Sequence, residues 1–280
     1  MDVSPEIEAK DLPTLLELEP SGEDRFLAVA AAYPWGRVYG GLVIAQGLVA
    51  AGRTVDEKYR IHSVHGYFIR GGSSEEKIDY DVDRIRDGRS FCTRRVVARQ
   101  TGGAILNLSA SFQVPEAETV HAQALEFPAG VPSPDELPTT EDTWSRVLEN
   151  KPIPSGMGHG RAQQWIRIRE PLEDASILHP AGLAYASDDL PIDAVSRAHP
   201  SSPPEDSDRG EHHEIFMAAS LDHAIWFHRP FRADQWLLHD VRSSGVYGGR
   251  GLAIAEIFDQ SGAHVATVTQ ECLLRERMGG

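Results

Sequence analysis

The alternation of apolar and polar positions divides the chain into helical and extended segments. Residues 37–55 carry Val38, Leu42, Ala45 and Val49 at helical spacing with small residues between them, which predicts a buried helix. Residues 12–19 predict a short amphipathic segment. The segments after the helix alternate with a period of two and are rich in β-branched and aromatic residues, which predicts strands. These segments are IHSVHGYFIRG, IDYDVDRI, SFCTRRVVARQ and ILNLSASFQV.

The pattern is lost between residues 114 and 160, where Pro, Glu and Ser dominate. We expect a linker here, with one short helix around EDTWSRVLEN. Alternation resumes at residues 163–170, residues 176–196 predict helix around a break, and residues 201–214 predict a polar loop. Strands are again expected at FMAASLDHAIWFHRPF, WLLHDVRSS, GLAIAEIFDQ and HVATVTQECLLR.

Both halves therefore contain helix followed by four strands, which indicates an internal repeat. An offset of 159 residues aligns Val82 with Val241 and Gly103-Ala104 with Gly262-Ala263. The same offset aligns Tyr67, Phe68 and Arg70 with Trp226, Phe227 and Arg229. A helix wrapped by a strongly bent antiparallel sheet, duplicated in tandem, is a double hot-dog, so we predict an α+β fold of this type. The expected domains are an N-terminal hot-dog at residues 1–116, a linker at 117–160 and a C-terminal hot-dog at 161–280.

The two copies serve as controls for each other, because shared packing positions match and specialised positions differ. The offset places Asp222 opposite Ser63, Ser244 opposite Ile85 and Gln270 opposite Ser111. Burying an unpartnered amide or carboxylate costs several kcal/mol, roughly 2–7 for an amide. The three polar groups of the second copy are therefore expected to meet. We predict a single polar site per chain, based in the C-terminal half.

Composition narrows the classes of function. The formal charge of −15 argues against nucleic acid as a partner, because phosphate contacts need a basic surface. No apolar run approaches the roughly 20 residues that a membrane span needs, so we expect no membrane span. The N-terminus lacks the basic and apolar regions of a signal peptide, so we expect a cytoplasmic protein.

A metal site is also not expected. Strand alternation puts Asp222 and His228 on one face and His223 on the other, and no HExxH motif is present. The two cysteines, Cys92 and Cys272, lie in apolar alternating runs and are expected to be buried thiols.

Three long stretches resemble the TesB-type (type II) acyl-CoA thioesterases. They are RVYGGLVIAQGLVAAG with IHSVHGYFIRGG, then DVDRIRDGRSFCTRRVVARQTGGAILNLSASFQ, and LDHAIWFHRPFRADQWLLHDVRSS with GRGLAIAEIFDQSGAHVATVTQE. The resemblance implies hydrolysis of fatty acyl-CoA to free fatty acid and CoA in fatty acid metabolism, without a cofactor. It implies that Asp222, Ser244 and Gln270 orient the attacking water.

The expected substrate contacts are Gly40, Gly41 and Tyr247. Backbone N–H groups at the start of the helix are candidates for holding the oxyanion. The chain departs from the family in Leu42, where a Gln is usual, and in Tyr247, where a small residue is usual. These departures keep open an acyl-CoA-binding protein of weak activity.

A hot-dog enoyl-CoA hydratase or dehydratase is a second alternative. It needs an acid/base pair of Asp and His, and the adjacent Asp222 and His223 point to opposite faces of a strand, which argues against it. Since hot-dog units commonly pair, both a single chain and a homo-oligomer, dimer or higher, stay open.

Overall fold

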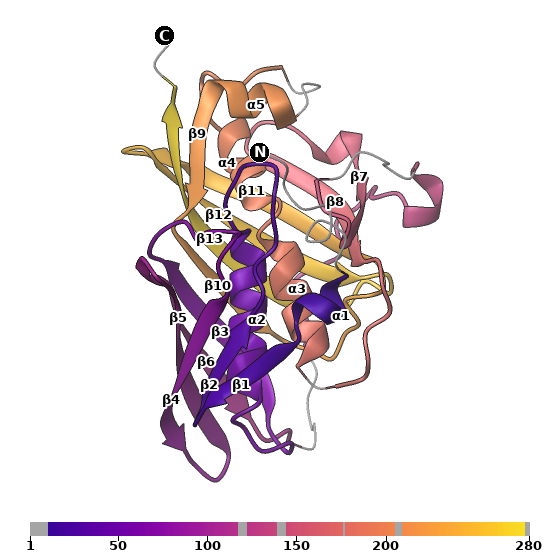
Figure 1. The fold of residues 1–280 in the computed structure, drawn as a ribbon. Helices are drawn as coiled ribbons and strands as arrows, with labels where there is room; N and C mark the ends of the chain where they lie inside the picture. The colour runs from indigo at the N-terminus through magenta and orange to yellow at the C-terminus, as the bar shows by residue number, and fades with distance from the viewer. Residues whose placement is uncertain (1–10, 117–121, 139–143, 176, 205–208, 278–280) are drawn as a thin grey trace.

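The computed structural model describes residues 11–116, 122–138, 144–175, 177–204 and 209–277. In this part of the chain thirteen strands form one antiparallel sheet that bends around two adjacent helices, α2 (Gly40–Gly52) and α3 (Leu178–Ser187) (Figure 1). The other helices are α1 (Leu12–Leu15), α4 (Pro191–Arg197) and α5 (Arg209–Ile215), with short 3₁₀ turns at η1 (Pro134–Glu136) and η2 (Pro154–Gly156).

The strands of the N-terminal half are β1 (Leu18–Gly22), β2 (Arg25–Ala28), β3 (Arg60–Phe68), β4 (Ile78–Asp87), β5 (Phe91–Gln100) and β6 (Gly103–Gln113). Those of the C-terminal half are β7 (Leu148–Pro152), β8 (Arg161–Ile168), β9 (Phe216–Ser220), β10 (Asp222–Phe227), β11 (Leu237–Tyr247), β12 (Arg250–Asp259) and β13 (His264–Glu276). The order across the sheet is β1-β2-β4-β5-β6-β3-β10-β13-β12-β11-β8-β7, and β9 pairs with β13.

The helix predicted at residues 37–55 forms α2 and is buried around most of its circumference. Its small residues let α3 approach closely: a Cβ at Gly52 would lie 2.9 Å from a side-chain carbon of Ile177. The polar side chain within it, Gln46, is fully buried, and its amide donates to the carbonyls of Leu15 and Val29. A helix that is apolar on all sides is typical of a core helix, and that is where α2 lies.

Pairing between β3 and β10 joins the two halves into one sheet. The register sets Ile225 opposite Val64, and both side chains are buried. The hydrophobic core is therefore continuous across the two halves.

The repeat is visible in the hydrogen-bond register. The ladder β4–β5 shifts between Arg84 and Arg86, and the ladder β11–β12 shifts between Ser243 and Gly245. The residues left without a partner in these ladders, Ile85 and Ser244, correspond to each other at the predicted offset of 159. A bulge at the same place in both copies indicates that the copies share one backbone plan.

The offset changes by one residue in the last strand. Arg99 pairs with Ala104 in the first copy, whereas Phe258 pairs with His264 in the second. The turn of the second copy is one residue longer, so the counterpart of Gln270 is Ala110 and not Ser111. The predicted alignment of Gly103-Ala104 with Gly262-Ala263 is wrong for this physical reason.

Part of the predicted linker belongs to the sheet, because β7 pairs with β8. The helix expected around EDTWSRVLEN is wrong for Leu148–Asn150, which lie in β7, and residues 141–143 lie outside the described residues. The polar loop expected over residues 201–214 contains the start of α5, and its residues 205–208 lie outside the described ranges. The segment at residues 12–19 forms α1 and the start of the β1–β2 hairpin.

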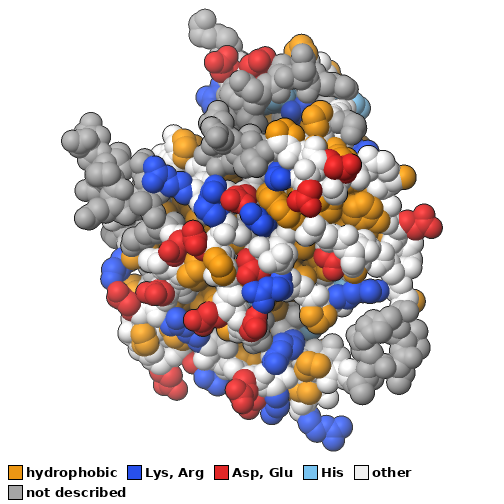
Figure 2. All heavy atoms as spheres, turned by 90° about the vertical axis from the view of Figure 1, so that its right-hand side faces the viewer, with side chains coloured by type: hydrophobic (Ala, Val, Ile, Leu, Met, Phe, Trp, Pro, Cys, Tyr) orange, Lys and Arg blue, Asp and Glu red, His pale blue; other side chains and the backbone are white. Residues whose placement is uncertain are grey.

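The surface mixes charges of both signs. On the face in Figure 2, acidic and basic side chains are interspersed with apolar ones. Among the described helices, none combines the length and the apolar character that a membrane crossing requires.

Candidate active site

The site is built around Asp188, the residue that ends α3. Its carboxylate is nearly buried, with 6% of the residue exposed. Oδ1 accepts a hydrogen bond from the hydroxyl of Ser220 at 2.8 Å, and Oδ2 accepts one from the backbone N–H of Gly41 at 2.9 Å. Because Gly41 lies in the first turn of α2 and Ser220 ends β9, both halves of the chain hold this one carboxylate.

A chain of side-chain hydrogen bonds leads to Ser220. The amide of Gln270 on β13 donates from Nε2 to the Ser220 oxygen at 2.9 Å. Its Oε1 accepts a hydrogen bond from Nδ1 of His223 on β10, and Nε2 of His223 lies 2.9 Å from the hydroxyl of Ser187. Gln270 and His223 are 0% and 1% exposed, so the set lies on the inner face of the sheet.

Burial shifts the titration of two of these groups. Loss of solvent raises the pKa of Asp188 to about 7, although the hydrogen bonds from Ser220, Gly41 and Gln270 act in the opposite direction. Burial also lowers the pKa of His223 to about 4, so the imidazole is neutral at physiological pH. A carboxyl with a pKa near 7 beside a hydroxyl and an amide can orient water and accept its proton at neutral pH.

The neighbouring acid, Asp189, belongs to a different set of contacts. Its carboxylate accepts hydrogen bonds from Trp144 Nε1 at 2.8 Å and from Gln164 Nε2 at 2.9 Å. Two consecutive carboxylates thus point to different neighbours, and the contacts with Ser220 and Gly41 are made by Asp188.

Glycine at position 41 is required by a close approach between the two helices. A Cβ there would lie 2.4 Å from the backbone carbonyl oxygen of Tyr185 in α3. A Cβ at Gly40 would instead meet side chains, Asp188 Oδ2 at 2.7 Å and Phe68 Cζ at 2.8 Å. The predicted use of the Gly41 N–H for an oxyanion meets a competing partner, because Asp188 accepts that N–H.

We expect Gly41→Ala to lower the free energy of unfolding by about 1–3 kcal/mol, because the helices must separate to admit the methyl group. The same displacement should lower activity by moving the N–H away from Asp188. Gly102→Ala is the control, since a Cβ there meets nothing closer than 3.8 Å. Urea denaturation and initial rates of both variants test this, and equal stability of the two would contradict the steric argument.

The structure does not bring the three sequence-predicted catalytic side chains together. Asp222 neighbours His223 on β10, so its side chain points to the opposite face of the sheet from His223 and Gln270. Its carboxylate accepts the backbone N–H of Glu271 at 2.7 Å. Only Gln270 of the three lies in the buried set, and the catalytic roles of the other two stay predictions.

Ser244 and Tyr247 lie on the surface at the end of β11. Ser244 is exposed at the bulge, and its carbonyl accepts a hydrogen bond from the Tyr247 hydroxyl at 3.1 Å. Tyr247 is 69% exposed and folds over Gly245. The Tyr247 hydroxyl is thus bound to the backbone of the bulge. The contact of Tyr247 with substrate stays a prediction.

Sequence reasoning missed Asp188 and Ser220. Comparison of the two copies could have found Ser220, because the offset of 159 aligns it with Ile61, an apolar residue. The pairings of Ser220 with Cys272 and of Ile61 with Phe112 match once the longer turn is counted. Asp188 follows a helix, where the strand offset does not apply, so this comparison gave no signal for it.

In the described part of the N-terminal copy, the positions that correspond to Ser220, His223 and Gln270 carry the apolar residues Ile61, Val64 and Ala110. Ala110 replaces Gln270, and its neighbour Arg94 on β5 fills the interior with a fully buried guanidinium. In the second copy the same pair of positions is Ala253 and Gln270. The large and small residues have exchanged strands, so this pair of interior positions holds an amide in the second copy and a guanidinium in the first.

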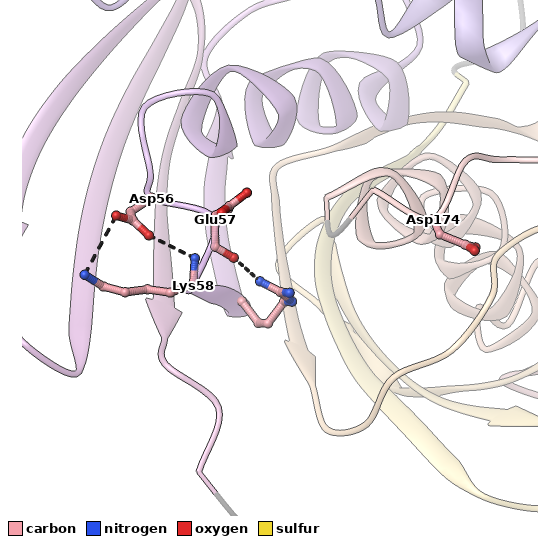
Figure 3. Close-up of a pocket in the computed structure, with 5 residues that line it drawn as sticks. Asp56, Glu57, Lys58 and Asp174 are labelled. Atoms are coloured by element: carbon pink, nitrogen blue, oxygen red, sulfur yellow. Dashed lines mark hydrogen bonds and ion pairs between the residues drawn. The ribbon is translucent and has the colours of Figure 1, made fainter.

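A surface depression of about 520 Å³ lies beyond the end of α2 (Figure 3). It is polar, and its lining residues are Asp56, Glu57, Lys58, Arg60 and Asp174. Lys58 pairs with Asp56 at 3.8 Å, and Arg60 donates to the carbonyl of Glu57. None of these residues belongs to the Asp188 set. Within the described residues no cluster of His, Cys, Asp and Glu has the arrangement of a metal site.

Comparison with known proteins identifies the family. Residues 30–113 match the family described as the acyl-CoA thioesterase N-terminal domain, and residues 119–274 match the acyl-CoA thioesterase C-terminal domain. The chain is 32% identical to acyl-CoA thioesterase 2 of Haemophilus influenzae, over 93% of this chain and 96% of that protein.

Solved structures agree. The acyl-CoA thioesterase II TesB2 of Mycobacterium marinum is 37% identical, with a TM-score of 0.79 over 96% of this chain and 98% of that chain. A hot-dog protein of Alicyclobacillus acidocaldarius, 18% identical, has a TM-score of 0.74 over 95% of this chain and 98% of that one, which confirms the predicted double hot-dog fold. The chain therefore belongs to the TesB-type acyl-CoA thioesterase family.

Proposed function

We propose that this chain hydrolyses acyl-CoA to a free carboxylic acid and CoA by direct attack of water. The observation that carries the proposal is the buried set in which Ser220 and Gly41 donate to Asp188 and Gln270 donates to Ser220. Acyl-CoA as substrate is supported by membership of the thioesterase family. Asp188, Ser220 and Gln270 are the proposed catalytic residues.

In the proposed reaction a water molecule binds beside Asp188, Ser220 and Gln270. Asp188 removes a proton as the water oxygen forms a bond to the thioester carbon, and the carbonyl electron pair moves onto oxygen. The N-terminal turn of α2 contributes the positive end of its dipole near this oxyanion. Collapse of the intermediate breaks the C–S bond, and the proton held by Asp188 passes to the CoA sulfur. The product carboxylic acid, which keeps the second proton of the water, ionises after release.

The sequence-predicted set of Asp222, Ser244 and Gln270 is the competing assignment. It shares Gln270 with the proposed set, so variants of Gln270 do not separate the two. The acids and the serines do separate them, because Asp188 and Ser220 contact each other whereas Ser244 is exposed on β11.

The test is release of free CoA from short-, medium- and long-chain acyl-CoAs, followed with a thiol reagent. Ser220→Ala should lower kcat about 10-fold or more, since a hydrogen bond to a charged group is worth about 1.5–3 kcal/mol. Ser244→Ala removes the same hydroxyl from an exposed position and should stay close to wild type. The opposite ranking would support the sequence-predicted set.

Thiol release also separates the activity from simple binding. Binding of acyl-CoA by the wild type without release of CoA would support an acyl-CoA-binding protein, the alternative suggested by Leu42 and Tyr247. The fatty nature of the acyl chain, a role in fatty acid metabolism, a cytoplasmic location and a homo-oligomer remain part of the proposal, and they rest on composition and family resemblance.

A further inference from the structure

His223 is a buried residue that the proposed reaction does not use directly. It lies between the hydroxyl of Ser187 and the amide of Gln270, and it is 1% exposed. Its two ring nitrogens contact these two groups. Two routes therefore lead from His223 to Asp188, one through Gln270 and Ser220 and the other through Ser187, the residue before Asp188.

The direction of the Gln270 amide decides where the Ser220 proton points. A hydroxyl donates one hydrogen bond, and in this set Ser220 donates to Asp188 and accepts from Gln270 Nε2. If the amide turned over, its oxygen would face Ser220 and compete with Asp188 for that proton. The amide itself has no intrinsic preference between the two orientations, so a neighbour must fix it.

His223 is that neighbour. The Gln270 oxygen can only accept, so Nδ1 of His223 carries the proton between them. Burial keeps the pKa of His223 at about 4, so its other nitrogen is unprotonated and accepts from the Ser187 hydroxyl at 2.9 Å, a shorter contact than the 3.4 Å from that hydroxyl to the Ala184 carbonyl. Each group then donates a hydrogen bond to the next, in the order Ser187, His223, Gln270, Ser220 and Asp188.

Packing alone does not require histidine at this place. The offset of 159 puts Val64 of the N-terminal copy opposite His223, and Val64 is 1% exposed in the same inner layer. The counterpart of Gln270 in that copy is Ala110, which has no amide to orient. A polar residue therefore occurs at this position in the copy that also carries the amide.

We infer that His223 is a positioning residue that fixes the orientation of the Gln270 amide and thereby keeps the Ser220 proton directed at Asp188. This inference rests on the proposed function of the Asp188 set. It assigns His223 no contact with substrate.

The test compares His223→Val with His223→Asn. Valine is the residue of the other copy and removes the donor, whereas the Asn amide nitrogen occupies a place similar to Nδ1 and can still donate to Gln270. We expect His223→Val to lower kcat about 10-fold with little change in KM, because a turned amide would draw the Ser220 hydrogen bond away from the Asp188 carboxylate. In the pH–rate profile of His223→Val, the fall in activity at low pH (the acid limb) should move to higher pH. The reason is that the Asp188 carboxyl is harder to ionise when it loses a hydrogen-bond donor. His223→Asn should keep kcat and the position of the acid limb close to their wild-type values.

His228→Asn is the matched control from the same stretch of sequence. His228 is exposed, and its Nε2 lies 3.0 Å from the Thr267 hydroxyl, so its loss should leave the acid limb in place. An unchanged acid limb in His223→Val, or equal defects in the Val and Asn variants, would overturn the inference. If Asp188→Asn were also fully active, the proposed function would fail instead, so the two failures are distinguishable.

A second measurement is made on the wild type, and a variant serves only to assign the signal. The ¹⁵N chemical shifts of the wild-type imidazoles report which ring nitrogen carries the proton. We expect one histidine, assigned by its loss in His223→Asn, to be neutral and protonated on Nδ1 down to about pH 5. A proton on Nε2, or a positively charged ring at pH 6, would contradict the proposed direction of the hydrogen bonds.

Discussion

Replacing Asp188 with Asn is expected to lower kcat/KM for acyl-CoA hydrolysis by about 10²- to 10⁴-fold, the usual contribution of a general base. The amide is close in shape but cannot accept a proton from water. It also offers one acceptor where Ser220 and Gly41 both donate to the carboxylate. The rate of thiol release from one acyl-CoA measures the loss of kcat/KM. Thermal unfolding of the variant shows whether the loss comes from misfolding.

The pH profile gives an independent view of the same group. Burial raises the pKa of Asp188 to about 7, and the proposed base must be ionised, so activity should rise with pH through about 7 and fall below it. The residual activity of Asp188→Asn should lack this acid limb. A wild-type profile that stays flat down to pH 5 would argue that another group removes the proton.

Asp222→Asn is the informative comparison. The Asp222 carboxylate caps the backbone N–H of Glu271 on the far side of the strand from Gln270. If this variant lost activity while Asp188→Asn retained both its activity and the acid limb, the sequence-predicted set would be favoured and the proposed one rejected.

Replacing Arg94 with Met is expected to destabilise the fold by about 3 kcal/mol, through the loss of several hydrogen bonds from a buried cation. The guanidinium donates to the hydroxyl and carbonyl of Thr54, just beyond α2, and to the carboxylate of Asp87 at 2.6 Å. It also donates to the carbonyls of Arg86 and Thr93. Methionine fills a similar volume but leaves the buried Thr54 oxygens without these donors.

Arg95→Met is the control on the next position of the same strand. Arg95 also pairs with an aspartate, Asp83, but both side chains are about half exposed. Exposed pairs contribute about 0–1 kcal/mol, so this variant should unfold close to wild type in a urea titration. Equal losses in the two variants would show that the buried network around Arg94 is not what stabilises the end of α2.

Much of the fold could be predicted from sequence because its signals are local. Small and apolar residues at helical spacing defined α2, and the alternation of IHSVHGYFIRG and its partner defined β3 and β10. Strand β7, LENKP, was missed because it is short and contains Lys and Pro without alternation. It is held by pairing with β8, a tertiary contact that no local pattern reveals.

The site was harder to predict because its members meet only in three dimensions. Gln270 was found through the repeat, although with a counterpart that was wrong by one residue. The repeat comparison selected Asp222, opposite Ser63, and passed over Ser220, two positions earlier, which also differs from its counterpart Ile61. The decisive acid, Asp188, follows a helix and becomes a site residue only where the start of α2 from the other half reaches it.

The first copy pairs Arg94 with Ala110 where the second copy pairs Ala253 with Gln270. This difference also bears on the history of the chain. In a pair of identical single-domain chains, any substitution would appear at both sites at once. Fusion of two copies removes this constraint, so one copy can lose its chemistry while the other keeps it. The first copy is not free to diverge everywhere, since its Gly41 donates to the Asp188 carboxylate of the second. Selection on the first half should therefore be strongest at the start of α2 and weaker around Arg94.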